Sequence, residues 1–110
     1  MNLNEAVHLA GQAQEDLQEA AQITDSVKRR LAEVQAGLAQ ANEKLTEATN
    51  KVGSLISAGY GNAEQSMAAI NIAERTWSET MGTSTNALAQ LDEMANSISA
   101  ASAEIGEIIG

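Results

Sequence analysis

The sequence predicts an all-α protein, built as an antiparallel hairpin of two long helices that form a coiled coil. Three observations lead to this fold class. Apolar residues recur with a heptad period through both halves of the chain, and proline is absent from all 110 residues. The heptad register breaks once, beside the closely spaced Gly59 and Gly61. A sustained heptad indicates a coiled-coil helix, and a break beside glycines indicates where the chain turns.

The first predicted helix covers residues 2–57. Alternating steps of three and four residues from Leu3 meet apolar side chains as far as Leu55, and Thr24 is the one polar exception. Asn2 and Glu5 have the spacing of a capping box, which favours a helix start there. The steps define two rows of one predicted seam. The a row is Leu3, Ala10, Leu17, Thr24, Leu31, Leu38, Leu45 and Val52, and the d row is Ala6, Ala13, Ala20, Val27, Val34, Ala41, Ala48 and Leu55.

The predicted bend covers residues 57–62. Continuing the first register past Leu55 places Gly59 and Asn62 on the seam, so the apolar stripe ends there. Gly59 or Gly61 can adopt positive φ and end the first helix, while Asn62, with Gln65 three residues later, can cap the second. The predicted turn residues are therefore Gly59, Tyr60, Gly61 and Asn62. The alternative is one continuous kinked helix, whose two halves would present their stripes in different directions.

The second predicted helix covers residues 62–109, with its seam displaced by one residue from the first register. The segment Gly82-Thr-Ser-Thr85 has poor helix propensity, so a kink is expected at 82–85. The predicted seam of this helix is Met67, Ile70, Glu74, Trp77, Met81, Ser84, Leu88, Leu91, Ala95, Ile98, Ser102, Ile105 and Ile109.

A bend near residue 59 brings together positions whose residue numbers add up to about 119. Leu31 is then expected to face Leu88, and Trp77 to lie over Ala41 and Ala48. Glu74 is a charged residue on the seam, and Lys44 and Lys51 are expected to neutralise it. The hairpin seam is predicted to consist of Leu31, Leu38, Leu45, Val52, Met67, Trp77, Met81 and Leu88.

The apolar stripes are wider than one seam needs, most of all near the two termini. A stripe of this width is typical of a three- or four-helix bundle. We therefore expect the single domain, residues 1–110, to be completed to a four-helix bundle by self-association, as a homodimer or higher oligomer, or by a similar helical protein. The predicted protein interface consists of Leu9, Ile23, Met94, Ile98, Ile105 and Ile108.

The sequence contains few residues arranged for catalysis, metal binding or nucleic-acid binding. The net charge of −9 argues against a nucleic-acid partner, and the absence of cysteine excludes disulfides and thiolate metal sites. Glu5 and His8 have the Glu-x-x-His spacing of di-iron bundles, but both fall outside the seam, so an exposed histidine is expected. No catalytic triad, phosphate-binding loop or enforced carboxylate pair is present. We expect no enzyme activity, no cofactor and no metal.

The amino-terminal segment, MNLNEAVHLAGQ, lacks the basic and apolar regions of a secretory signal peptide. No run of about 18 apolar residues occurs, so direct membrane insertion is not expected. These features predict a cytoplasmic protein, or one exported without a cleavable signal peptide.

The layout resembles the small acidic two-helix substrates of type VII secretion, which are about 100 residues long, lack cysteine and form dimeric bundles. Those families carry Trp-x-Gly in the bend and Tyr-x-x-x-Asp/Glu in the tail. Here the bend carries Tyr60-Gly61, and Tyr60 and Glu64 have the second spacing, within the bend region. Residues 98–110, ISAASAEIGEIIG, also resemble the signalling helix of bacterial chemoreceptors.

Three functional hypotheses follow. The first is a non-catalytic helical-hairpin interaction and oligomerisation module, of the kind that the type VII resemblance implies. The second is a structural subunit of a phage or another multi-subunit assembly. The third is a signalling coiled-coil fragment similar to that of chemoreceptors.

Overall fold

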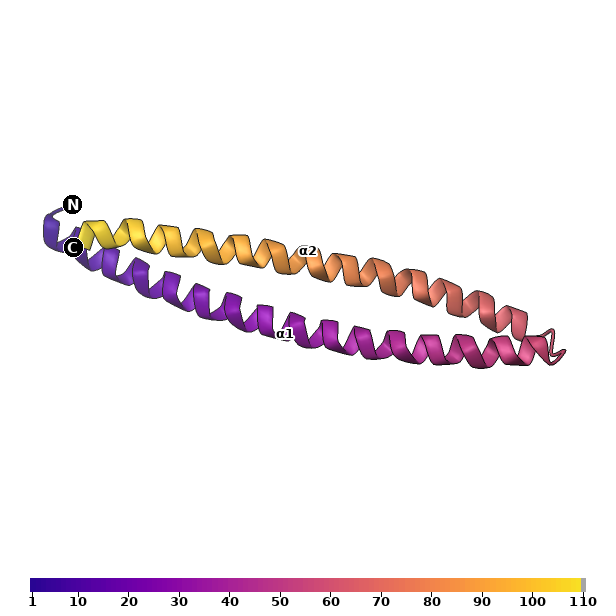
Figure 1. Cartoon of the computed structure of the whole chain (residues 1–110). Helices are drawn as coiled ribbons and strands as arrows, with labels where there is room; N and C mark the ends of the chain where they lie inside the picture. The colour runs from indigo at the N-terminus through magenta and orange to yellow at the C-terminus, as the bar shows by residue number, and fades with distance from the viewer. Residues whose placement is uncertain (110) are drawn as a thin grey trace. The chain divides into compact units, whose positions relative to one another are not determined.

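The computed structural model describes residues 1–109 and confirms the predicted all-α antiparallel hairpin. Helix α1 spans Leu3–Ser57 and helix α2 spans Ala63–Ile109. A short bend connects the helices, and α2 returns along α1 in the opposite direction (Figure 1). The break in heptad register at residues 57–62 therefore marks a reversal of the chain, and the alternative of one continuous kinked helix is wrong.

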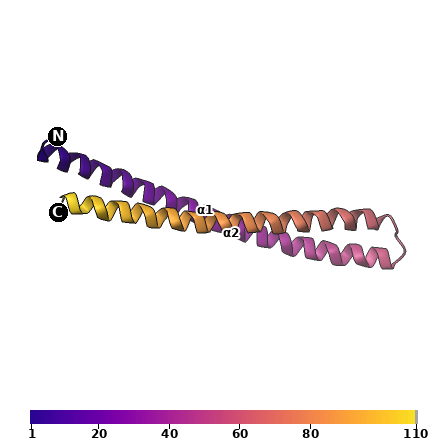
Figure 2. The same cartoon turned by 90° about the horizontal axis from the view of Figure 1, so that it is seen from above.

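The chain divides into two compact units, and each contains a part of both helices. The bend unit is Ala32–Asn86. The open-end unit consists of Met1–Leu31 and the described residues from Ala87 onward. Within the open-end unit, the first turns of α1 lie at the same end as the last turns of α2 in both views (Figure 2). Each unit is a pair of antiparallel helix segments.

Helix α1 begins with the predicted cap. The Oδ1 atom of Asn2 accepts a hydrogen bond of 2.8 Å from the backbone N–H of Glu5, and the side-chain amide of Asn2 donates to Glu5 Oε1 at 3.4 Å. The return contact in a capping box runs from the glutamate to the backbone N–H of the cap residue. Here the two side chains bond each other instead. The first contact satisfies one of the N–H groups that the first turn leaves free.

Helix α1 ends in a Schellman motif centred on Gly59. The backbone N–H of Tyr60 donates to Leu55 O at 3.1 Å, and that of Gly59 donates to Ile56 O at 3.0 Å. This pair of bonds defines the motif, which needs a residue with positive φ at the position that Gly59 occupies. Gly59 has φ of 95°, and no other described residue has positive φ. Gly61 also lies in the bend but does not have positive φ.

Helix α2 begins without the predicted side-chain cap. Among the hydrogen bonds of residues 1–109, none involves the side chain of Asn62. Turn carbonyls take its place, since Ala63 N–H donates to Tyr60 O at 3.0 Å and Glu64 N–H donates to Gly61 O at 3.1 Å. The tight turn therefore supplies acceptors that the expected Asn62 cap would have supplied.

Helix α2 continues through the segment 82–85, where the sequence favours a kink. The hydroxyls of Thr83 and Thr85 donate back to the carbonyls of Glu79 and Met81, each at 3.0 Å. Such bonds compete with the helical ladder and often accompany bending. Residues 82–85 are helical throughout, and the kink expected there stays a prediction.

The covered interior is made of small residues. Thr24, which is 3% exposed, and Ser84, which is 6% exposed, are buried together with Ala10 and Ala63, and no large side chain of the described residues is fully buried. Two helices can surround a small side chain, but a leucine needs neighbours on more sides. The eight predicted seam residues are accordingly half-buried: Leu31, Leu38, Leu45, Val52, Met67, Trp77, Met81 and Leu88.

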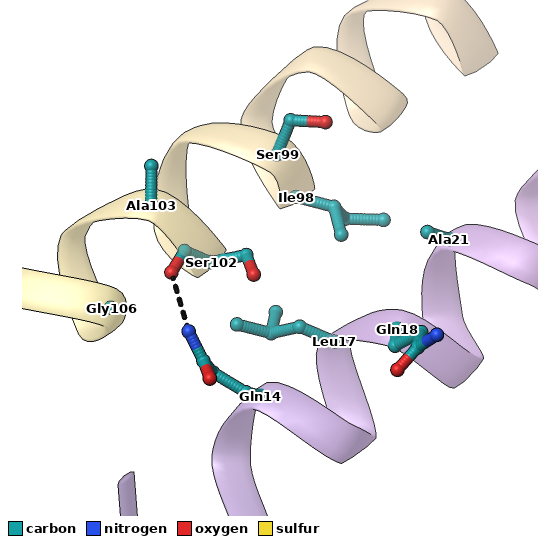
Figure 3. Close-up of a pocket in the computed structure, with 9 residues that line it drawn as sticks. All are labelled: Gln14, Leu17, Gln18, Ala21, Ile98, Ser99, Ser102, Ala103 and Gly106. Carbon is teal, nitrogen blue, oxygen red and sulfur yellow. Dashed lines mark hydrogen bonds between the residues drawn. The ribbon is translucent and has the colours of Figure 1, made fainter. Parts of the chain in front are cut away.

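The register matches the predicted one within each unit. In the open-end unit, Leu17 extends toward Ser102 and Ile98 extends toward Ala21 (Figure 3), and the residue numbers of both pairs add up to 119. In the bend unit, the methyl carbon of Met67 lies 3.9 Å from the point that a Cβ on Gly53 would occupy. The numbers of that pair add up to 120, one more than predicted.

Half of the predicted d row of α1 is misplaced, while Ala6, Ala13, Ala20 and Ala48 are half-buried as expected. Val27, Val34, Ala41 and Leu55 of the d row are exposed, whereas the residue after each of them is half-buried: Lys28, Gln35, Asn42 and Ile56. The seam of α1 is therefore turned toward these following residues, because Lys28 and Gln35 make polar contacts with α2. In α2, by contrast, every predicted seam residue is buried or half-buried except Ile109.

The bend gives the first testable prediction. Gly59→Ala is expected to lower the free energy of unfolding by about 1 kcal/mol, because a residue with a Cβ is strained at positive φ. Gly61→Ala is the matched control, since Gly61 also has open space around it but does not have positive φ. Chemical denaturation followed by circular dichroism measures both. Equal losses for the two variants would contradict the assignment of the turn to Gly59.

Candidate interaction surface

Polar contacts join the two helices of the bend unit on one flank of the seam. The Gln35 side-chain amide donates to Thr85 Oγ1 at 3.3 Å. The indole N–H of Trp77 donates to the backbone carbonyl of Leu38 at 2.7 Å. The contact of Trp77 with Leu38 was not foreseen, because the predicted register placed this side chain over Ala41 and Ala48. A half-buried indole needs an acceptor, and the carbonyl of Leu38 supplies it.

Glu74 does not pair with either lysine that the sequence suggested. Thr49 Oγ1 lies 3.0 Å from Glu74 Oε1 and 2.8 Å from the carbonyl of Leu45, so its one hydroxyl proton serves two acceptors. Lys44 pairs instead with Glu47 at 3.1 Å, one turn along the same helix. The expected neutralisation of Glu74 by Lys44 and Lys51 is therefore wrong, and the hydroxyl of Thr49 is the group that contacts this carboxylate.

The open-end unit has an ion pair on the corresponding flank. Lys28 Nζ on α1 contacts Asp92 Oδ1 on α2, while Arg29 pairs with Asp25 of its own helix at 2.7 Å. The hydrogen bond and the negative charge of Asp92 raise the pKa of Lys28 above its usual 10.5, and Asp25 adds a smaller effect in the same direction. Arg29 is thus balanced by a charge on its own helix, whereas Lys28 pairs with a charge on the other helix.

An open groove of about 590 Å³ lies between the helices of the open-end unit. Its floor is apolar, with Leu17 and Ile98 between the two ribbons (Figure 3). The Gln14 side-chain amide crosses the groove and donates to the Ser102 carbonyl at 3.1 Å. Gly106 leaves room for this contact, because a Cβ on Gly106 would lie 3.3 Å from Gln14 Nε2. The remaining lining residues are Gln18, Ala21, Ser99 and Ala103, so no charged residue borders the groove.

The other flank of the open-end unit has exposed apolar side chains, with the exposed Asp16 and Arg30 among them. Lys28 and Asp92 meet, so they lie on the same side of the seam. Successive helical residues are turned by about 100°, and Val27 and Met94 therefore flank the seam on the opposite side. We call this surface the apolar face, and its members are exposed: Leu9 (49%), Ile23 (65%), Val27 (42%), Met94 (50%) and Ile108 (59%).

The apolar face contains four of the six predicted interface residues: Leu9, Ile23, Met94 and Ile108. The other two, Ile98 and Ile105, are half-buried, and Ile98 lies between the helices in the groove. Val27 was not predicted to be on this surface, because the heptad placed it in the seam. Lys28 is the residue of the sequence that could have revealed the exposure of Val27. The Lys28 side chain reaches Asp92 on α2 only when α1 is rotated so that Lys28, and not Val27, lies at the seam.

The bend unit exposes apolar side chains of its own. Val34 and Leu55 of the d row are exposed on α1, as is Ile72 on α2. Tyr60 in the bend is also exposed, and Gly59, Gly61 and Asn62 around it are exposed as well. Val34 comes directly before Gln35, which contacts Thr85, and Val27 comes directly before Lys28, which contacts Asp92. In each unit, the exposed valine therefore lies on the side of α1 that faces away from the polar contact.

The described residues provide no grouping for metal chemistry. Glu5 and His8 are both exposed, and residues 1–109 contain no cluster of three or more His, Cys, Asp or Glu side chains that could hold a metal ion. In the same part of the chain, neither helix has a stretch apolar enough to cross a membrane. The surface features that stand out are thus the apolar face and the groove between the helices of the open-end unit.

Comparison with known proteins returned no match to a family model, to a curated protein or to a solved structure.

The ion pair gives the second testable prediction. Because the pKa of Lys28 is raised in the folded chain, the pair stabilises the fold below the unfolded pKa of about 10.4, and this stabilisation is lost as pH rises through the folded pKa. Wild type is expected to be more stable than Lys28→Met at pH 8, with the difference shrinking above pH 10.5. Thermal unfolding across this range measures it. A difference that stays constant up to pH 12 would contradict the pairing.

Proposed function

We propose that this protein is a non-catalytic helical-hairpin module that associates with a second helical hairpin, either another copy of itself or a similar protein, to form a four-helix bundle. The observation that carries the proposal is the exposed apolar face of the open-end unit, Leu9, Ile23, Val27, Met94 and Ile108. These side chains are spaced along both helices on one flank, as a facing pair of helices requires.

The accessible area supports the same conclusion. A compact monomer of 11.5 kDa is expected to expose about 5,800 Å². This chain exposes 7824 Å², an excess of about 2,000 Å². A standard protein interface removes about 800 Å² from each partner, and permanent dimers remove more. The excess reflects how little of its surface a two-helix hairpin buries, and it is larger than the area that a standard interface covers on one partner.

The polar flank supports this face as the one that binds. The opposite side of the open-end unit has the Lys28–Asp92 pair and the Gln14 contact, which use polar groups within the hairpin. Burying apolar side chains is favourable, whereas burying a charged pair carries a desolvation penalty. The resemblance to type VII substrates supports the same class, since those proteins are hairpins that form dimeric bundles.

The third testable prediction separates association from folding. Ile23→Glu and Met94→Glu are expected to remain helical but lose association, because each would place a charge where a second hairpin packs. Leu38→Glu is expected to lose both helicity and association, since Leu38 is in the seam of the bend unit. Circular dichroism measures helicity and sedimentation velocity measures assembly.

Gln22→Glu is the matched control, because it adds the same charge next to Ile23 on an exposed position outside the apolar face. It is expected to associate like wild type. A folded, thermally cooperative monomer of the wild-type chain at micromolar concentration would overturn the proposed function.

A further inference from the structure

A row of exposed residues runs along α1 within the open-end unit at heptad spacing. Its members are Leu9, Asp16, Ile23 and Arg30, and all four are exposed. Seven residues make almost two full turns of a straight helix, so each member is displaced by only about 20° from the one before it. The row therefore lies on one side of α1, and Ile23 is its member at the centre of the apolar face. We call it the Ile23 row.

The two charged members of the Ile23 row are unpaired within the open-end unit. Lysine and arginine occur in this unit at residues 28–30 only. Lys28 pairs with Asp92 and Arg29 pairs with Asp25, which leaves Arg30 as the third cation. None of the ion pairs of residues 1–109 includes Arg30 or Asp16. Asp16 is more than three helical turns from residue 28, so a cation that pairs with it comes from outside its own unit.

We propose that the open-end units of two copies of this chain associate, with their α1 helices antiparallel along the Ile23 row and Ile23 of both copies near the twofold axis. This inference rests on the proposed function and specifies its partner and geometry. Asp16 and Arg30 are each seven residues from Ile23, so Asp16 of one copy lies opposite Arg30 of the other. In an isologous contact the same surface serves both copies, and this contact therefore occurs twice.

The residues around the row support the same pairing. Residues 15–19 contain three acidic side chains and residues 28–30 contain three basic ones, and the antiparallel arrangement brings these two segments of the two copies together. Apolar side chains gather near the axis. Val27 is one turn from Ile23, and Met94 lies at the level of residue 25 by the register of this unit, in which facing numbers add up to 119. The centre of the contact is thus apolar, and opposite charges flank it.

Other arrangements of the same surface bring like charges together. A parallel pairing of the two α1 helices would place Asp16 opposite Asp16 and Arg30 opposite Arg30. An antiparallel pairing centred on Asp16 would also set the two aspartates against each other. Laying α1 over α2 of the second copy, in the register of the hairpin, would set Asp16 beside Glu104. Electrostatic complementarity selects orientation more than it adds affinity, so these charges act on which arrangement forms.

The fourth testable prediction uses disulfide trapping, which is clean in a chain without cysteine. Ile23→Cys is expected to form a disulfide-linked dimer as the main product of mild oxidation. In helices packed about 10 Å apart, two Cα atoms that face each other at the axis are about 5 Å apart, which a disulfide spans. Gln22→Cys is the matched control, an exposed neighbour outside the apolar face that should yield little dimer. Non-reducing electrophoresis after denaturation measures both products, and equal yields would contradict the inference.

Orientation is tested by refolding Asp16→Cys together with Arg30→Cys. The mixture is expected to form a mixed disulfide, since the mixed dimer also keeps one intact Asp16–Arg30 contact, whereas each variant alone should not cross-link. Self-linking of Asp16→Cys would indicate a parallel pairing and would overturn the inference. A protein that sediments as a dimer but whose Ile23→Cys variant does not cross-link would overturn this geometry and leave the proposed function standing. A monomer at micromolar concentration would overturn both.

Charge exchange gives an independent test of the Asp16–Arg30 contact. Arg30→Glu is expected to weaken association about two- to fivefold at low salt, because it creates two like-charge contacts in the dimer. Adding Asp16→Arg in the same chain restores opposite charges and is expected to recover the wild-type dissociation constant. Arg30→Glu without weakening, or a double variant without recovery, would overturn the assigned contact. Sedimentation equilibrium measures these constants.

Discussion

The narrowness of a two-helix seam is the constraint on which the other features of this protein depend. Two antiparallel helices enclose only the residues directly between them, and here those are Ala10, Thr24, Ala63 and Ser84. Larger apolar side chains such as Leu38 and Trp77 are covered on one side and open on another. Hydrophobic burial within one chain is therefore limited, and the same apolar residues that favour folding remain available for a partner.

Directional contacts compensate for the limited burial by fixing the register. Lys28 with Asp92, Gln14 with the Ser102 carbonyl and Trp77 with the Leu38 carbonyl each link the helices at one level. Apolar heptads alone tolerate slippage by a whole heptad, because every level offers similar side chains. A slip would separate Lys28 from Asp92 and would move the space at Gly106 away from the Gln14 side chain. The polar flank thus provides specificity, while the apolar flank provides surface for association.

Most of the fold followed from the sequence, and the main error has a physical cause. The break beside Gly59 predicted the reversal, and the α2 seam from Met67 to Ile105 was placed correctly because a one-residue shift of its apolar row was visible. Four residues of the α1 d row, Val27, Val34, Ala41 and Leu55, were misplaced because a heptad count does not weigh polar contacts. Lys28 and Gln35 turn the helix toward α2, and the count offers no signal for that rotation. The groove, likewise, depends on Gln14 reaching past Gly106, which no periodicity encodes.

The hydrogen bond between Trp77 and the Leu38 carbonyl has a spectroscopic consequence. Trp77 is the only tryptophan in the chain, so its fluorescence originates from a single, half-buried indole in the bend unit. Separation of the two helices would release the indole N–H to water and shift the emission to longer wavelength. The chain therefore contains an intrinsic optical reporter of seam opening, and this reporter is remote in sequence from Ile23 and Met94. Fluorescence can thus monitor the closure of the hairpin separately from the assembly of its apolar face.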